Sequence, residues 1–424
     1  MMKINKWTLG LAAVGLVTIP TVMQAEEKPL SALQTLVSST TISGYVDTSA
    51  DWTIGNGHGN ASPAGYAFNT PSKQDGFNLN AVNVMLQKLP DEKENWAAGY
   101  TIDMVYGPNA VGYNTSVGSA GSDFALKQAY VELVAPVGNG LHAKMGTFDS
   151  IIGYEAYHSY KNPNYTRSYG YSIEPTELTG LLLQYAVVKE VVLSAGVADT
   201  ANAGINNRSF LGGPGQPKSE SDKTYMGAIT LTAPDSMGFL AGSQLYGGIV
   251  NGFNTSAFGT GDRSGQTWYY AGAFIKTPIK ELTVGVAYDY TSINGSASGW
   301  TVNSTPPPPP APAGAAGGPK AWLDAVSVYA SYAATEKLKF HVRGEYAWMK
   351  DGMANYLNKV AGSGQSVGLA DKIFAVTGTI EYDLWANVIS RVEFRWDHAA
   401  DGTSPYSGSA RNSCLLAANV IYKF

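Results

Sequence analysis

The feature that most constrains the fold of this chain is a repeated alternation of apolar and polar residues. Segment 337–350 shows it most clearly, with one apolar and one polar set of side chains: Leu338, Phe340, Val342, Tyr346 and Trp348 against Lys339, His341, Arg343 and Glu345. A period of two places successive side chains on opposite faces of a β-strand, whereas a helix has a period of 3.6. Segments 388–397 and 282–290 alternate in the same way. The pattern therefore predicts strands with one apolar and one polar face.

Sixteen such segments follow one another along the chain. The expected strands cover 40–55, 76–89, 95–107, 122–136, 140–150, 176–188, 189–200, 223–234, 238–251, 266–278, 280–292, 320–334, 336–350, 371–385, 387–398 and 409–424. The connections between them alternate between short turns and long loops. The long loops cover 56–75, 108–121, 151–175, 201–222, 252–265, 293–319, 351–370 and 399–408.

Short turns at one end and long loops at the other are typical of antiparallel barrels in outer membranes. In lipid the sheet must close, because an open edge would leave backbone N–H and C=O groups without partners. We therefore predict an all-β transmembrane barrel of 16 antiparallel strands over residues 40–424, with short periplasmic turns and long extracellular loops. The alternative is a soluble secreted β-protein, which would have no reason to keep every second connection short and which would be extracted without detergent.

The N-terminal residues have the composition of an export signal. Lys3 and Lys6 precede an apolar run from residue 7 to 20, and Ala25 precedes two glutamates. We expect residues 1–25 to be a signal peptide and residues 26–39 a short periplasmic segment. The run is too short to cross about 30 Å of hydrocarbon as a helix, which disfavours the alternative of an N-terminal membrane anchor.

Composition excludes several classes of protein. The formal net charge is −5, and without Lys3 and Lys6 the 26 remaining basic residues against 33 acidic ones give −7, which argues against a nucleic-acid partner. A single cysteine excludes a disulfide framework. The five histidines show no metal-ligand spacing on one strand face, and no Ser and His are placed as neighbours for nucleophilic catalysis. We therefore expect no enzyme, metal site or cofactor.

The last strand carries a second signal. Phe424, Tyr422 and Val420 share one face, whereas Lys423 and Asn419 share the other. A final strand with alternate hydrophobic residues and a terminal Phe resembles the signal that the barrel assembly machinery reads, so Phe424 is the expected contact with that machinery. The same parity places Cys414 toward lipid.

If the apolar faces meet lipid, the polar faces line the interior. The expected pore-lining residues are Lys339, His341, Arg343, Glu345, Arg391, Glu393, Arg395, Asp397, Arg411, Asp103 and Asp289. Charges in a packed core are costly unless they are paired, so we expect water to fill the barrel, as the width of sixteen strands allows. An alternative left open by the sequence is that neighbours pair along the wall, Arg395 with Asp397 and Arg343 with Glu345. Both arrangements can hold together.

The third long loop, 151–175, contains six tyrosines and few charges. An exposed loop would not need so many aromatic residues, so we expect it to fold inward as a constriction. Its residues Tyr154, Glu155 and Tyr157 would then face Arg343, Arg391, Arg395 and Arg411 and create a transverse field. The alternative is a loop that packs over the barrel mouth or at a subunit contact. The segment Pro306 to Pro312, in the sixth long loop at 293–319, predicts a stiff polyproline II stretch, either a spacer or a surface contact.

Several motifs resemble a known family. They are KQAYVEL at 127–133, KMGTFDSIIGYE at 144–155, NYTRSY at 164–169, ISGYVD at 42–47 and GFNLN at 76–80. With these motifs the chain resembles the OmpL-like β-barrel porins over essentially the whole mature length. The resemblance implies an outer-membrane pore for small solutes, without a specified substrate, and analogy with porins of this size suggests a homotrimer.

Together these observations predict a Gram-negative outer-membrane porin, exported by its signal peptide, that forms a water-filled channel for passive diffusion of small hydrophilic solutes and ions. Lumen width and wall charge would set its selectivity. The acidic residues Asp47, Asp51, Asp103, Glu132 and Asp289 would favour cations and the arginines anions, and the sequence alone leaves that balance open. The alternative function is a plugged or narrow barrel that acts as a surface receptor or adhesin through its long loops.

Overall fold

The structure is a computed structural model. It describes residues 40–54, 64–69, 73, 75–91, 95–110, 123–201, 205–206, 208–210, 218–253, 265–293, 321–350, 370–406 and 410–424. The expected signal peptide, the segment 26–39 and the proline stretch at 306–312 lie outside the described residues.

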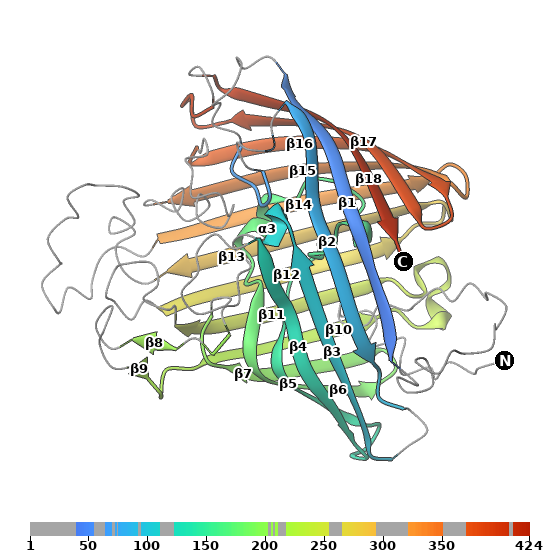
Figure 1. Ribbon diagram of the computed structural model, residues 1–424, viewed down its shortest axis with the longest axis vertical. Helices are drawn as coiled ribbons and strands as arrows, with labels where there is room; N and C mark the ends of the chain where they lie inside the picture. Colours follow the sequence, from blue (N-terminus) through green and yellow to red (C-terminus); the bar gives the residue numbers. More distant parts are fainter. Residues whose placement is uncertain are drawn as a thin grey trace, which may run out of the picture.

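The described chain forms one closed antiparallel barrel of sixteen strands (Figure 1). The strands are β1 (Thr41–Ile54), β2 (Gly76–Lys88), β3 (Ala97–Tyr106), β4 (Phe124–Ala135), β5 (Leu141–Asp149), β6 (Glu177–Val188), β7 (Val191–Ala198), β10 (Thr224–Thr232), β11 (Gln244–Phe253), β12 (Gly265–Lys276), β13 (Leu282–Ile293), β14 (Ala321–Ala333), β15 (Leu338–Lys350), β16 (Lys372–Trp385), β17 (Val388–Ala399) and β18 (Asn412–Lys423). The short strands β8 (Ser209–Phe210) and β9 (Lys218–Ser219) form a separate hairpin.

The barrel closes between its first and last strands. β1 pairs with β18 from Tyr45 opposite Lys423 to Ile54 opposite Cys414. Beyond this register, the backbones of Gly44 and Phe424 exchange two hydrogen bonds of 3.0 Å each. The terminal residue therefore takes part in closure, and this part of the sheet has no free edge that would need water or a second chain.

The predicted fold class and the number of barrel strands are confirmed. The largest difference in boundaries is at β11, which begins at Gln244 instead of the predicted residue 238. The intervening residues form the 3₁₀ helix η4 (Asp235–Leu240), in which Gly238 has a φ of 61°. A left-handed residue of this kind interrupts an extended strand, so the turn between β10 and β11 is longer than predicted.

The two faces of the strands alternate as the sequence predicts. On β15, Val342 is 53% exposed, whereas its neighbour Arg343 is 0% exposed. On β18, Val420 and Tyr422 are exposed and Asn419 and Ile421 are buried. The exposed outer face is thus apolar and the buried inner face carries charge, as in barrels whose outer surface meets lipid.

The interior of the barrel is filled in part by the connection between β5 and β6. This segment, residues 150–176, includes the 3₁₀ helix η3 (Ser159–Lys161) and the short helix α3 (Tyr169–Ile173). Figure 1 shows α3 within the ring of strands, and α3 contacts β13, β14 and β15. Among the described residues, no helix is long and apolar enough to cross a membrane. We call residues 150–176 the inner loop.

Candidate functional site

The inner loop is held at its base and then crosses the barrel. The Ser150 N–H donates to the Thr176 carbonyl at 3.0 Å, which ties the two ends of the loop together. Its side chains and backbone reach opposite parts of the wall: His158 lies 3.0 Å from Asp103 on β3, and the Ile173 carbonyl accepts from the Trp268 indole on β12 at 2.7 Å. The loop therefore divides the lumen, and its contacts determine which part remains open.

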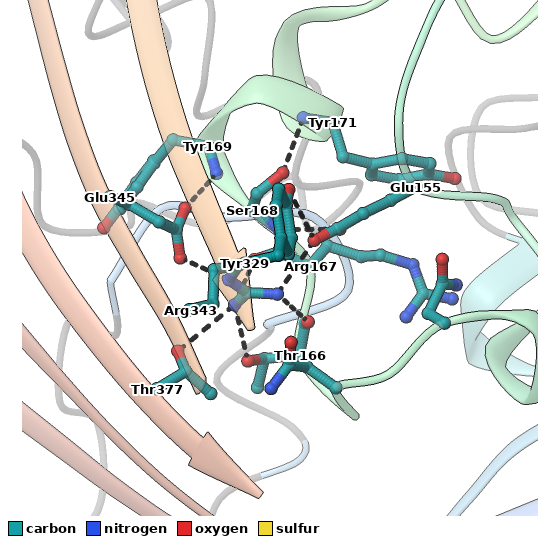
Figure 2. Close-up of polar contacts among 12 residues, drawn as sticks. Glu155, Thr166, Arg167, Ser168, Tyr169, Tyr171, Tyr329, Arg343, Glu345 and Thr377 are labelled. Carbon is teal, nitrogen blue, oxygen red and sulfur yellow. Dashed lines mark hydrogen bonds and ion pairs between the residues drawn. The ribbon is translucent and has the colours of Figure 1, made fainter. Parts of the chain in front are cut away.

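Arg343 on β15 is the centre of the densest polar network (Figure 2). Its guanidinium forms ion pairs of 2.7 Å with Glu345 and 2.9 Å with Glu155 of the loop. It also donates to the Thr166 carbonyl at 2.7 Å and to the Thr377 hydroxyl at 3.3 Å. The planar fork of arginine suits this arrangement, because its several donors can reach carboxylate and carbonyl oxygens at once.

Two arginines on β17 bind the loop backbone in the same way. Arg395 pairs with Asp397 at 2.9 Å and donates to the Arg167 carbonyl at 2.6 Å. Arg391 pairs with Glu381 at 2.9 Å and donates to the carbonyls of Ser159 and Asn162 at 3.1 and 2.7 Å. The Ser159 carbonyl also accepts from the Asn162 N–H at 3.1 Å. None of these loop carbonyls belongs to a β-ladder, so the arginines supply donors to buried backbone acceptors that the sheet does not pair.

The carboxylates of the same wall accept from the loop. Glu393 accepts from the backbone N–H groups of Tyr165 at 2.6 Å and Thr166 at 2.9 Å. Tyr169 donates twice, through its N–H to Glu345 at 2.8 Å and through its hydroxyl to Asp397 at 2.9 Å. Arginines and carboxylates on β15 and β17 therefore bind both the carbonyl and the N–H groups of the loop. We call the following six residues the clamp: Arg343, Glu345, Arg391, Glu393, Arg395 and Asp397.

The environment of the clamp differs from the sequence expectation. From the sequence we expected these charges to lie beside water, but all six side chains are buried, and Arg343 and Arg395 are 0% exposed. The alternative pairs, Arg343 with Glu345 and Arg395 with Asp397, are in direct contact. The alternation of residues fixed the inward direction of these side chains, but it contained no information on what occupies the space in front of them. Here that space holds the inner loop, whose backbone replaces the water that the charges would otherwise require.

We expected Glu155 of the loop to face the arginines across open lumen, but the structure has the two in direct contact. Glu155 bonds directly to Arg343 and accepts from the Tyr329 hydroxyl at 3.1 Å. Tyr154 stacks on Tyr329, with ring centroids 4.2 Å apart. Tyr157 lies elsewhere, with its hydroxyl donating to the Asn109 carbonyl at 2.9 Å.

The other residues singled out from the sequence lie at the edge of the clamp or apart from it, and Lys339 borders the clamp through Glu381, which Arg391 also binds. Lys339 and His341 are near the short-turn end of β15, where Lys339 pairs with Glu381 at 2.8 Å and His341 bonds to Ser331 at 2.8 Å. Arg411 is exposed just before β18, where it donates to the Ala399 carbonyl at 3.4 Å. Asp103 on β3 is buried beside His158 of the inner loop. Arg411 therefore does not share a network with the other three arginines.

Asp289 on β13 supports the loop near α3. A Cβ atom on Gly170 would lie 2.3 Å from its carboxylate oxygen, so a larger residue at position 170 would force the Asp289 carboxylate to move. Glu174, at the C-terminal end of α3, shares a hydrogen bond with Asp289. Burial and the neighbouring Asp289 carboxylate raise the pKa of Glu174 well above its usual range. A protonated Glu174 can donate this bond, which stabilises the pair.

Two residues outside the set expected from the sequence also shape the site. Arg167 of the loop is buried, with its guanidinium 5.4 Å from the centroid of the Tyr171 ring, and it donates to the Tyr157 carbonyl at 2.6 Å. Lys127 on β4 forms an ion pair with Asp149 on β5. An arginine within a tyrosine-rich segment was the available signal for Arg167. For Lys127, strand parity could indicate an inward side chain, but its ion-pair partner Asp149 lies on another strand.

Open space remains at two places beside the loop. A pocket with an empty volume of about 630 Å³, open at its mouth, is lined by Lys127, Asp149, loop residues 150–157, Tyr171 and residues 174–176. A smaller pocket of about 360 Å³ lies between β1 and the loop, beside Asp47, Asp51 and Arg167. In the described part of the chain, no three His, Cys, Asp or Glu side chains are grouped to hold a metal ion.

Solved structures share this architecture at low sequence identity. The outer-membrane channel DcaP of Acinetobacter baumannii superposes with a TM-score of 0.55 at 11% identity, covering 91% of this chain and 97% of that chain. An anion-selective porin from Comamonas acidovorans gives a TM-score of 0.56 at 10% identity, covering 91% and 99%. The trimer form of OmpT from Vibrio cholerae gives 0.53 at 10% identity, also covering 91% and 99%. At these identities the likeness shows the fold.

Sequence comparison gives the family. No curated protein sequence matches the chain. A family model described as "Putative beta-barrel porin-2, OmpL-like" matches residues 39–424, which includes the whole barrel and the inner loop. The chain therefore belongs to this family of porins, and it is an outer-membrane β-barrel channel.

Proposed function

We propose that the protein lets small hydrophilic solutes and ions diffuse passively across the bacterial outer membrane, through a water-filled path that the inner loop narrows. The observation that carries the proposal is a loop bound to the inner wall of a closed sixteen-stranded barrel, with open pockets on its other side. A barrel of this size is wide enough to leave an aqueous lumen, and a bound loop reduces that lumen to a width that selects by size. The fold and family are those of a channel rather than of an enzyme.

The proposal includes how the protein reaches and assembles in the membrane. Residues 1–25 would direct export and be removed, and residues 26–39 would remain in the periplasm. The assembly machinery would contact Phe424 at the end of β18. A homotrimer is supported by the trimer form of OmpT, which shares the fold. Cross-linking of the protein in outer-membrane vesicles would show a band at three times the monomer mass if this assembly is right.

A second function is favoured by one observation. The clamp residues are completely buried, and the wall they occupy is filled by the loop, as it would be in a plugged barrel. Such a barrel would act as a surface receptor or adhesin through its long loops and would pass no solute.

Reconstitution of the purified full-length mature protein in planar bilayers separates the two functions. A channel gives stepwise current increments whose size grows with salt concentration, and liposomes that contain it swell in small sugars. A plugged barrel gives neither signal. The matched control is the same protein unfolded by heat before addition. Absence of current from folded protein, with sugars excluded from the liposomes, would contradict the proposed function.

A further inference from the structure

We propose that solutes pass the inner loop on the β4–β6 side of the barrel, and that Asp149, backed by Lys127, sets the charge preference of this path. The inference rests on the proposed function and adds to it the route and the residues that select. It places the selective charge away from the arginine-rich wall that the sequence points to.

The clamp side is closed to solutes. Arg343 and Arg395 are fully buried, and they contact the loop backbone directly. The Arg395 guanidinium carbon also lies 3.6 Å from the centroid of the Tyr66 ring, so an aromatic ring covers this guanidinium. A solute on this side would have to break ion pairs and hydrogen bonds that are buried together.

Two other sides of the loop are packed with rings and apolar side chains. Toward β1, the Tyr45 ring meets His158 edge to face, with centroids 5.6 Å apart, and His158 is stacked near Tyr160. Toward β7 and β12, Ile151 and Ile152 of the loop belong to a buried cluster with Ala198 and Trp268. The smaller pocket on the β1 side has a polar lining, but its charged residues Asp47, Asp51 and Arg167 are only 1–4% exposed. A passing ion would therefore meet little accessible charge on this side.

The β4–β6 side is different because it combines open space with accessible charge. The pocket of about 630 Å³ lies here, between the loop and the wall residues Lys127 and Asp149. The Asp149 side chain is 27% exposed, whereas that of Lys127 is 2% exposed. Both residues face the pocket, but the carboxylate is the one that water reaches.

The arrangement of the pair determines the sign of the selectivity. The Lys127 ammonium bonds to Asp149, lies 3.8 Å from Glu177 and lies 4.9 Å from the centroid of the Tyr157 ring. Its charge is therefore surrounded by two carboxylates and an aromatic face. A passing ion meets the Asp149 carboxylate first, and charged side chains at a narrow point select by sign. The path should favour cations.

The route can be tested with two matched cysteine variants in a Cys414→Ser background, which removes the one native thiol. Ser150→Cys places a thiol in the pocket. Ser327→Cys places one on the inner face of β14, opposite Glu345, where the serine hydroxyl is buried without a hydrogen-bond partner in the described structure. Each exchange is nearly isosteric. A membrane-impermeant cationic methanethiosulfonate is added to single channels in planar bilayers.

We expect reaction at Ser150→Cys to reduce the current within minutes and reaction at Ser327→Cys to be at least about tenfold slower, in proportion to solvent access. If Ser150→Cys does not fold, Thr176→Cys reports on the same pocket. Faster or equal block at Ser327→Cys would overturn the inference and leave the proposed function intact. Wild-type protein that passes no current would instead remove the proposed function, and this inference with it.

The charge preference has its own test. Asp149→Asn should lower the cation-to-anion permeability ratio by about three- to tenfold, as expected for removal of one charge near a narrow path. The matched control is Asp383→Asn, which removes a partly exposed carboxylate near the short-turn end of β16 and should change the ratio less. An unchanged ratio in Asp149→Asn would overturn the assignment of this residue.

Discussion

The inner walls at β15–β17 and at β4–β6 both carry charged residues, but the structure uses them differently. On β15 and β17 the clamp binds the loop backbone and is fully buried. On β4 and β5 a single pair, Lys127 and Asp149, borders a pocket and keeps one carboxylate partly exposed. A charged residue on the inner face of a barrel strand therefore need not lie on the solute path. What decides is whether another part of the chain has replaced the water in front of it.

The difference has a chemical origin. Arginine and carboxylate alternate along β15 and β17, with Arg343 two residues before Glu345 and Arg395 two residues before Asp397. The wall thus presents donors and acceptors close together, which matches the mixture of C=O and N–H groups on an irregular loop. Charge-assisted hydrogen bonds of this kind are stronger than neutral ones. One lysine bound to one aspartate cannot hold a backbone segment in this way.

The largest expected effect comes from breaking the clamp at its centre. Arg343→Met removes the partner of both Glu155 and Glu345 and leaves two buried carboxylates without it. Loss of one member of a buried charge network costs about 3–5 kcal/mol. We expect a lower unfolding temperature of the detergent-solubilised barrel, measured by heat-modified mobility in gels, and larger current fluctuations from a loosened loop.

Lys339→Met is the matched control for Arg343→Met. It removes a cation from the same face of the same strand, but Lys339 is 34% exposed and pairs near the short-turn end. Exposed pairs contribute about 0–1 kcal/mol, so the unfolding temperature should change little. Equal losses in the two variants would mean that the clamp is no more important than any inward ion pair.

A smaller effect is expected from a single hydroxyl of the loop. Tyr169→Phe removes the donor to the buried Asp397 but keeps the ring and the N–H bond to Glu345. A buried acceptor left with one partner fewer costs about 1–3 kcal/mol. Tyr154→Phe is the control, because it keeps its stacking on Tyr329 and its hydroxyl has no hydrogen-bond partner among the described residues. Comparable unfolding temperatures for the two variants would contradict the role given to Tyr169.

The smallest expected effect is a pH dependence at the base of the loop. Burial and the Asp289 carboxylate raise the pKa of Glu174, so the folded state favours its protonated form. Its contribution to loop stability is complete below the ordinary pKa of a glutamate and is lost as the pH rises through the raised pKa. Current fluctuations should therefore increase with pH. Asp289 and Glu155 face Glu174 and oppose its ionisation, which strengthens the trend.

Glu174→Gln isolates this contribution, because the amide stays neutral and can still donate to Asp289. The variant should show the quiet current of the acidic form at every pH tested. A pH slope equal to that of the wild type would assign the titration to another group.

Much of the fold could be predicted because it depends on local pattern. A period of two sets the strands, and alternating connection lengths set the antiparallel order, so residues such as Val342 and Arg343 could be assigned to opposite faces without any knowledge of neighbours. The predicted start of β11 was wrong, because a few local residues form a 3₁₀ helix with a left-handed glycine there without disturbing the apolar pattern.

The candidate site could be predicted only in part. Strand parity indicated that Arg343, Arg391 and Arg395 point inward, but parity also assigned Arg411 to that group, and Arg411 lies outside the network. Parity applies within a strand, whereas Arg411 precedes the first paired residue of β18. Lys127 and Asp149 were not singled out, because their relation depends on the register between β4 and β5.

The sequence by itself determined that this chain forms a barrel and, within its strands, which face meets lipid and which residues point inward, since these features follow from residues two positions apart. Only the tertiary structure decided what those inward residues touch. Tyr169 and Glu345 are 176 positions apart, and Tyr165 and Glu393 are 228 apart. No periodicity extends over such distances, because these partners meet only after the barrel has closed around the loop and the loop has displaced the water from one wall.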